Sequence, residues 1–223
     1  MNSPVESANV PENAATTTSH RIGRVPGSKN SAMQDRAVRT REAIIAVAAR
    51  HFDTDGYGHT SINTISATGK FAKGAMYYHF PSKEAIAEHL ISDWNRTLDE
   101  TISEALTSGS SSTAGEKLAA IFISFARHIG EDTNLRAGMK LTLEPTINNG
   151  AAFAHWVDGI SGIVETAITS AEFPDTPATH RLAWTLCAST IGAAHAAAAL
   201  GEDIDITTRI EDIVAAHLRG ALG

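Results

Sequence analysis

The sequence is poor in cysteine and has no long hydrophobic run. Its single cysteine, Cys187, excludes a disulfide framework and a cysteine-based zinc cluster. The first thirty residues are rich in Ser, Thr, Asn and Pro, so we expect no secretory signal and a cytoplasmic location. The longest apolar stretch, residues 182–200, is mostly alanine and includes Thr and His, which favours a buried helix of a soluble protein over a membrane span.

The sequence also lacks the motifs that serve catalysis. It contains no His-x-x-x-His, His-Glu-x-x-His or Gly-x-Ser-x-Gly pattern, and no glycine-rich phosphate loop after a strand. The ten histidines are scattered, and the pair His155 and Asp158 has the spacing of neighbours on a helix surface. We therefore expect that the protein is not an enzyme and needs no cofactor or metal.

Positive charge is concentrated in one part of the chain. Between His20 and Lys83 there are ten Lys or Arg residues and four acidic ones, whereas from Glu84 onward there are eight basic and nineteen acidic residues. A basic segment on an acidic body favours a small polyanion-binding module joined to a part that does not bind polyanions. The alternative is a solvated surface on which positive charges cluster by chance, since it would give the same numbers of basic and acidic residues.

The placement of proline and the hydrophobic period predict an all-α fold. Three of the seven prolines lie in residues 1–34, which lack periodicity and are expected to form a disordered basic and polar tail. The other four prolines separate segments with helical spacing. We predict about nine helices, over approximately residues 35–52, 61–69, 72–79, 83–107, 118–129, 135–143, 153–168, 178–200 and 206–217.

Residues 60–83 have the dimensions of a helix-turn-helix motif. Two short helices are joined by a turn, Thr60 or Ser61 can cap the first, and Ser82 can cap the long helix that follows. The second short helix would be free to enter a DNA major groove. The residues expected to face inward and fix the angle between the two helices are Ile62, Ile65, Phe71 and Met76.

The exposed side of the second short helix carries groups that suit DNA. Lysine donates to phosphate or guanine, and tyrosine hydroxyls and histidine can bond phosphate oxygens. Lys83 lies in the first turn of the next helix, where backbone N–H groups also attract phosphate. The expected exposed set is Lys73, Tyr77, Tyr78 and His79.

The segment GAMYYHFPSKEAI, which begins at Gly74, resembles the helix-turn-helix signature of the TetR-type transcriptional repressors. The resemblance spans about residues 39–90. It implies an all-helical homodimer in which residues 35–82 bind double-stranded operator DNA and residues 83–223 bind a ligand and dimerise. The predicted DNA contacts are Arg36, Arg39, Thr60, Ser61, Lys70, Lys73, Gly74, Tyr77, Tyr78, His79 and Lys83.

Two residues depart from the family pattern Ala-Gly-Val-(Ser/Thr)-Lys-Gly in the turn. Lys70 stands where glycine normally accommodates a positive φ, at a cost of about 1 kcal/mol. Ala72 replaces the hydroxyl residue that would cap the recognition helix, which loses about 1 kcal/mol and a phosphate contact. Lys70 can supply a phosphate contact instead.

The basic residues before the motif allow two interpretations. Arg21, Arg24 and Lys29 either lie along phosphates or in the minor groove, or belong to an unbound, solubilising tail. Arg36 and Arg39 are held closer to the motif at the start of the first predicted helix, and we include both among the DNA contacts.

A second resemblance lies in residues 135–141, LRAGMKL, and 153–156, FAHW, which are similar to the γ-butyrolactone-receptor subgroup of actinobacterial regulators. In that subgroup a tryptophan at the matching position lines the signal pocket, which implies this role for Trp156. Aromatic walls between helices suit a small molecule, although the same side chains would equally form a plain core. The expected neighbours of Trp156 in the pocket are Phe122, Phe125, Met139, Leu143 and Ile160.

The last two predicted helices have the features of a subunit interface. Small residues on one helix permit a short interhelical distance, and the other carries an apolar stripe. The alternative is a buried helix pair within one subunit. The predicted dimer interface consists of Gly192, Ala193, Ala196, Ile210, Ile213 and Val214.

Together these features predict a ligand-responsive transcriptional repressor that a small molecule, suspected to be γ-butyrolactone-like, releases from its operator. One alternative is a repressor of an efflux pump with a broad hydrophobic pocket. The other is a helical ligand-binding protein that does not bind DNA, which the departures at Lys70 and Ala72 favour.

Overall fold

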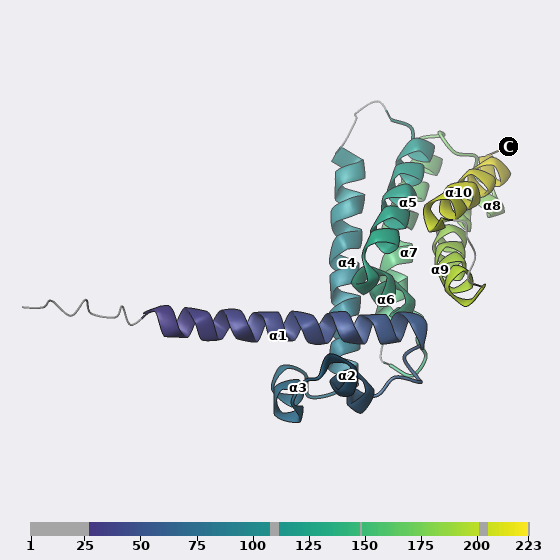
Figure 1. The fold of residues 1–223 in the computed structure, drawn as a ribbon. Coiled ribbons are helices and arrows are strands. Elements are labelled where there is room, and N and C mark those ends of the chain that lie inside the picture. The colour runs from purple at the N-terminus through teal and green to yellow at the C-terminus, as the bar shows by residue number, and fades with distance from the viewer. Residues whose placement is uncertain (1–26, 108–111, 148, 201–204, 223) are drawn as a thin grey trace, which may run out of the picture. The chain divides into compact units, whose positions relative to one another are not determined.

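The computed structural model describes residues 27–107, 112–147, 149–200 and 205–222. These residues form ten helices and no strand, which confirms the all-α prediction. Within this part of the chain, no helix is both long and apolar enough to span a bilayer. The helices in Figure 1 are α1 (Gly27–Thr54), α2 (Ile62–Gly69), α3 (Lys73–His79), α4 (Lys83–Thr107), α5 (Ala114–Glu131), α6 (Thr133–Leu141), α7 (Gly150–Thr169), α8 (Pro177–His180), α9 (Leu182–Leu200) and α10 (Ile206–Leu222).

Helix α1 begins earlier than predicted. It starts at Gly27, and not near residue 35, so the predicted disordered tail is wrong for residues 27–34. This segment contains Ala, Met and Gln, which are good helix formers, and no proline occurs between Pro26 and Pro81. Arg21 and Arg24 lie outside the described residues. The chain divides into two units after Arg36, and the packing described below concerns residues 37–223.

The predicted helix over residues 178–200 is two helices, α8 and α9, separated at Arg181. Thr176 Oγ1 accepts a hydrogen bond from the N–H of Thr179 at 3.2 Å and so caps α8, while Pro177 lies in the first turn, where its missing N–H is harmless. Thr179 Oγ1 also donates to the carbonyl of Ala221 at 3.3 Å. This bond connects the single turn of α8 to α10. The cap and this bond define α8 as a separate helix, which the hydrophobic period does not predict.

Serine caps set the boundaries of the helices around the predicted motif. Ser61 Oγ accepts from the N–H of Thr64 at 3.0 Å, so Ser61 and not Thr60 caps α2. Ser82 Oγ accepts from the N–H of Ala85 at 3.1 Å, which confirms Ser82 as the cap of α4. These caps satisfy N–H groups that have no partner inside their own helix.

The buried side chains form two clusters that share α4. The first cluster joins α4, α5, α6, α7, α9 and α10 and includes Trp94 and Trp156. The second joins α1, α2 and α3 to α4, α6 and the start of α7. Leu90 of α4 belongs to the second cluster and Trp94, one turn later, to the first. Helix α4 therefore connects the predicted DNA-binding motif with the larger helical body.

Helix α6 approaches α4 closely at a glycine. A Cβ atom on Gly138 would lie 2.3 Å from the carbonyl oxygen of Leu90 and 3.1 Å from Cβ of Trp94. Only glycine permits this approach, because any side chain would overlap the α4 backbone. Helix α6 is thus pressed against α4 where α4 passes from one cluster to the other.

Candidate functional site

The helix pair α2 and α3 is held together by its turn. Lys70 adopts the left-handed conformation, with φ 54° and ψ 36°, as its position in the motif predicted. Phe71 N–H donates to the carbonyl of Ser66 at 2.9 Å, and Ser66 Oγ donates to the carbonyl of Phe71 at 2.8 Å. A Cβ on Gly69 would lie 2.0 Å from the Phe71 ring. Gly69 therefore makes room for Phe71 to fold back onto α2.

The side chains predicted to face inward do so. Ile65 and Met76 are fully buried, and Ile62 and Phe71 are partly buried against the same cluster. The angle between α2 and α3 is thereby fixed by packing, which leaves the opposite side of α3 to solvent.

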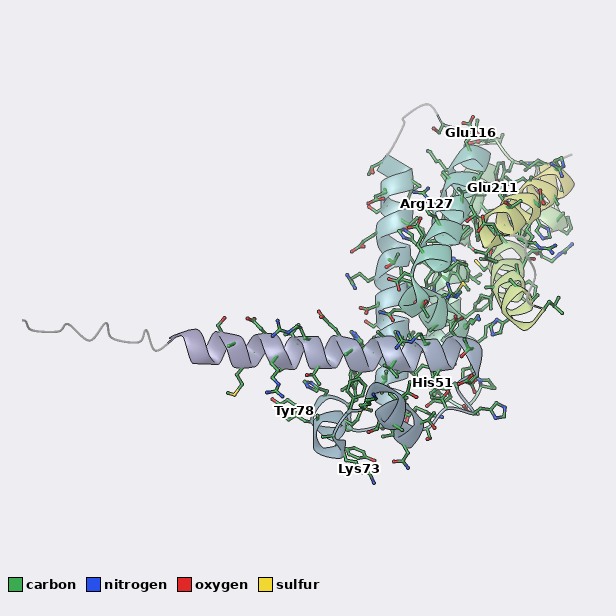
Figure 2. The ribbon with its side chains drawn as sticks, viewed as in Figure 1. His51, Lys73, Tyr78, Glu116, Arg127 and Glu211 are labelled. Atoms are coloured by element: carbon green, nitrogen blue, oxygen red, sulfur yellow. The ribbon has the colours of Figure 1, made fainter. Side chains whose placement is uncertain are left out.

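The exposed side of α3 carries the predicted DNA-contact residues. Tyr78 is 80 % exposed, Tyr77 is 54 % exposed and Lys73 is exposed, and Figure 2 shows Lys73 and Tyr78 projecting outward from α3. The rings of Tyr78 and half-buried His79 meet edge to face, with centroids 5.0 Å apart. A Cβ on Gly74 would meet nothing within 4 Å, so the start of α3 is open to a ligand. The surface offers one cation and several hydrogen-bonding groups.

Ala72 precedes α3 without a capping hydrogen bond from its side chain, as its methyl group requires. The remaining predicted contacts Ser61, Lys70, Arg36 and Arg39 all have exposed side chains. Their role in DNA binding stays a prediction.

Two predicted DNA contacts have structural roles instead. The side chain of Thr60 is buried, and its Oγ1 donates to the carbonyl of Gly56 at 2.9 Å. Lys83 Nζ donates to the carbonyls of Tyr57 at 2.7 Å and Thr60 at 2.9 Å and lies 3.8 Å from the Tyr57 ring centroid. Burial lowers the pKa of Lys83. We therefore remove Thr60 and Lys83 from the DNA-contact set, because both hold the loop between α1 and α2 in place.

A cluster of aromatic rings surrounds Trp156. Its ring centroid lies 5.3 Å from that of Trp94, 5.8 Å from that of Phe125 and 6.2 Å from that of Phe122. The predicted neighbours Met139 and Ile160 are also fully buried in this cluster. The sequence analysis does not single out Trp94, and its edge-to-face contact with Trp156 appears only in the structure.

Leu143 is wrong as a member of this cluster, because its side chain is 47 % exposed. Helix α6 ends at Leu141 and the chain then turns, so the helical spacing that relates Leu143 to Met139 no longer holds. Thr142, on the same segment, is buried, and its Oγ1 donates to the carbonyl of Met139 at 2.7 Å.

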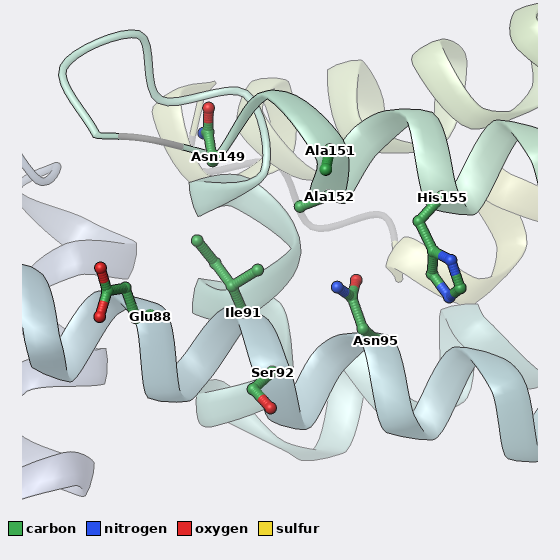
Figure 3. A pocket seen from close by; sticks show the side chains of 8 residues that line it. All are labelled: Glu88, Ile91, Ser92, Asn95, Asn149, Ala151, Ala152 and His155. Carbon is green, nitrogen blue, oxygen red and sulfur yellow. The ribbon is translucent and has the colours of Figure 1, made fainter.

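Three buried polar atoms near Trp156 have no hydrogen-bond partner among the described residues. They are Nε1 of Trp94, Nε1 of Trp156 and Oδ1 of Asn95. A buried donor or acceptor without a partner costs about 1–3 kcal/mol. Asn95 also lines a cleft of 530 Å³ between α4 and α7 (Figure 3), a volume that suits a small molecule.

A charged network links α6 to the end of α1. The Asp53 carboxylate accepts from Arg136 Nε at 3.0 Å and lies 2.9 Å from Arg136 Nη2, and it accepts from Lys140 Nζ at 2.6 Å. Arg136 also donates to the carbonyl of Ile129. Burial alone would raise the pKa of Asp53, but the hydrogen bonds and charges of Arg136 and Lys140 outweigh it and lower the pKa.

Comparison with known proteins agrees with this arrangement. Residues 44–90 match the model of the bacterial regulatory proteins of the tetR family. The chain is 33 % identical over 135 residues to the A-factor receptor protein of Streptomyces griseus, a match that covers 60 % of this chain and 46 % of that protein. The chain thus spans less than half the length of this curated relative.

Two solved structures share the fold over most of the chain. CprB from S. coelicolor A3(2), titled a TetR family protein, has a TM-score of 0.69 and 26 % identity, and covers 84 % of this chain and 91 % of its own. A γ-butyrolactone receptor described as ArpA-like has a TM-score of 0.61 and 25 % identity, and covers 84 % and 100 %. Residues 44–90 belong to the tetR family of bacterial regulatory proteins, and most of the chain shares the fold of these two structures.

The predicted dimer surface is only partly exposed. Gly192 and Ala196 are exposed on α9, and they line a groove of 330 Å³ together with half-buried Ala193 and Ile213. Trp184, which the sequence analysis missed, is 58 % exposed and precedes Gly192 by eight residues, so both lie on one face of α9. The spacing of four between Trp184, Ala188, Gly192 and Ala196 could have revealed this face.

Ile210 and Val214 are wrong as dimer contacts. Both side chains are buried in the first cluster of their own subunit, where α10 packs against α5 and α9. An apolar stripe on a helix identifies the buried side but not the partner, so the sequence could not separate these two residues from Ile213.

Proposed function

We propose that this chain is a homodimeric, ligand-responsive transcriptional repressor that binds operator DNA through α3 and leaves it when a small molecule binds near Trp156. The observation that carries the proposal is the exposed face of α3, with Lys73, Tyr77 and Tyr78 on a helix pair whose other side is packed. Relatives named as an A-factor receptor and as γ-butyrolactone receptors support a lactone as the signal.

Helix α3 fits a major groove. An α-helix with its side chains is about 10–12 Å across, and the groove is about 12 Å wide. Lys73 in the first turn would donate to a phosphate or to guanine, and the tyrosine hydroxyls would donate to phosphates at the groove edge. A twofold dimer would place two such helices at half-sites roughly 34 Å apart.

The coupling between ligand and DNA runs through α6 and α4. A ligand among the aromatic rings would displace Trp94 or Met139, and α6 has no free space toward α4 at Gly138. A shift of α6 would therefore move α4 and, through Arg136 and Asp53, the end of α1. The ligand must bind the two arrangements with different affinity to release the DNA.

A fluorescence polarisation titration tests DNA binding. The probe is the promoter fragment upstream of the protein's own gene, at several salt concentrations. The logarithm of the association constant falls linearly with the logarithm of the salt concentration. We expect Lys73→Ala to make this slope less steep by about 0.9, the value for the loss of one phosphate contact. Tyr77→Ala should weaken binding with little change in slope, and Arg127→Ala, which removes an exposed cation from α5, should bind as the unmodified protein does.

The alternative is a helical ligand-binding protein that does not bind DNA. The uncapped start of α3 at Ala72 and the left-handed Lys70 favour it. If the folded dimer fails to bind its own promoter at low salt, or if Arg127→Ala weakens binding as much as Lys73→Ala, the α3 assignment is wrong.

A further inference from the structure

One ring nitrogen on α4 faces two groups that it cannot bind at the same time. Nε2 of His89 lies 3.3 Å from Nη1 of Arg41, on α1, and 3.3 Å from Oδ2 of Asp93, one turn further along α4. Arginine can only donate a hydrogen bond, and a carboxylate can only accept one. Nε2 therefore accepts from Arg41 when it carries no proton and donates to Asp93 when it carries one.

Arg41 links this nitrogen to the end of α3. Its guanidinium lies over the ring of Phe80, 5.0 Å from the centroid, and Phe80 is buried. Phe80 follows α3 directly, and its N–H donates to the carbonyl of Met76 at 2.8 Å. The rings of Phe80 and His89 are also close, with centroids 6.3 Å apart. Arg41 thus joins α1, the end of α3 and α4 at one place.

The surroundings of His89 favour the uncharged ring at neutral pH. Burial is the largest influence and lowers the pKa of His89 below its ordinary value. Of the charged groups that face the ring, Asp93 on α4 raises this pKa, whereas Arg41 on α1 and Arg96 on α4 lower it, and Phe80 brings no charge. Below its pKa the ring carries a positive charge toward Arg41, so an attraction becomes a repulsion.

We propose that His89 is a positioning residue for DNA binding, which holds α1 and α3 in the DNA-binding arrangement only while its ring is unprotonated. The neutral ring holds Arg41 against Phe80 by accepting its N–H. A proton taken up from solvent at Nε2 turns this nitrogen toward Asp93 and releases Arg41, so the contact at the end of α3 is lost. Acid therefore weakens operator binding. This inference rests on the proposed function, since it takes α3 as the DNA-binding helix.

The pH dependence of DNA binding tests this role. Fluorescence polarisation with the promoter fragment, at constant ionic strength and from about pH 8 to about pH 5, gives Kd for each protein. Acid should raise Kd about tenfold more in the unsubstituted protein than in His89→Gln, the equivalent of one hydrogen bond to a charged group. The glutamine carbonyl accepts from Arg41 at every pH. Comparison with the variant also removes the effect of other histidines, whose protonation strengthens binding to phosphates.

His180→Gln is the matched control. His180 is an exposed histidine on α8, and like His89 it has carboxylate partners, Glu165 at 3.1 Å and Asp175 at 2.8 Å. It does not contact α1 or α3 through any of these bonds. Its variant should therefore show the same rise of Kd in acid as the unsubstituted protein.

A titration of the ring tests the contact without DNA. Proton–carbon correlation spectra give the Cε1–H signal of each histidine, and the signal that is missing from the His89→Gln spectrum belongs to His89. The midpoint of its titration should lie below the ordinary value of histidine. Arg41→Gln should raise this midpoint, because it removes the positive charge beside the ring.

Each result decides a separate point. An equal change of Kd with pH in the unsubstituted protein and in His89→Gln, or loss of the acid effect in His180→Gln, overturns the role of His89. An unchanged midpoint in Arg41→Gln overturns the contact between the guanidinium and the ring. If the folded protein does not bind the promoter even at about pH 8, the proposed function fails instead, and the ring titration still decides whether the contact exists.

Discussion

Removing the Asp53 carboxylate should destabilise the protein through the two cations that it leaves behind. The side chain of Lys140 is 6 % exposed and that of Arg136 is 23 % exposed, so water can reach Arg136 better than Lys140. Removing one partner of a buried ion pair costs about 3–5 kcal/mol. Because Arg136 can be partly rehydrated, we expect Asp53→Ala to lower the free energy of unfolding by about 3 kcal/mol.

A double-mutant cycle separates the ion pair from other effects of the substitution. Lys140→Met leaves Asp53 with Arg136 and should cost about 1 kcal/mol. The double variant Asp53→Ala/Lys140→Met no longer buries an unpaired ammonium, so the coupling energy should be about 2 kcal/mol. Urea unfolding followed by tryptophan fluorescence, at one fixed protein concentration, measures all four proteins.

The pH dependence follows from the lowered pKa of Asp53. A carboxyl group whose pKa is lower in the folded state stabilises that state above its unfolded pKa of about 3.9, and the contribution disappears as pH falls through the folded value. The stability difference between the unsubstituted protein and Asp53→Ala should be constant from about pH 5 to 7 and shrink below about pH 4. A coupling energy below about 0.5 kcal/mol, or a difference that grows with acid, would refute this reasoning.

Three further substitutions test local features. Ala72→Ser should give α3 a side-chain cap and raise stability by about 1 kcal/mol, seen as a higher Tm, and an unchanged Tm would mean that the serine does not reach the helix N–H groups. Lys83→Met should lower stability by about 2 kcal/mol in thermal melting, because the carbonyls of Tyr57 and Thr60 lose their donor; a smaller loss than for an exposed lysine elsewhere contradicts that role. Gly138→Ala should cost about 1–3 kcal/mol in urea unfolding, whereas Gly162→Ala in α7, with open space around its Cβ, serves as the control and should cost little.

Much of the helical architecture was predictable because it follows from local signals. The apolar period placed Ile65 and Met76 inside, and the left-handed conformation of Lys70 follows from its place in the turn. Serine caps marked two helix starts. These features depend on a few neighbouring residues, which is the information that a sequence pattern carries.

The remaining errors involve contacts between distant segments. Lys83 was assigned to DNA because it begins a helix, but the loop that contains Tyr57 folds back and supplies carbonyls to it. Ile210 and Val214 face their own subunit because α10 packs on α5, 75 residues or more away in sequence. Asn95 looked like an ordinary helix residue until α7 was placed opposite it.

The second buried cluster has a consequence for engineering. Ala137, Leu141 and Ala152, which come from α6 and α7, share that cluster with Ile44 and Ile65 of α1 and α2. A fragment that ends at Leu90 would keep α3. It would expose the apolar side chains of α1, α2 and α4 that Ala137, Leu141 and Ala152 cover in the whole protein. A chimaera that joins residues 37–90 of this chain to another protein should therefore include α6 as well. Otherwise the other protein must supply apolar side chains at the places of Ala137 and Leu141.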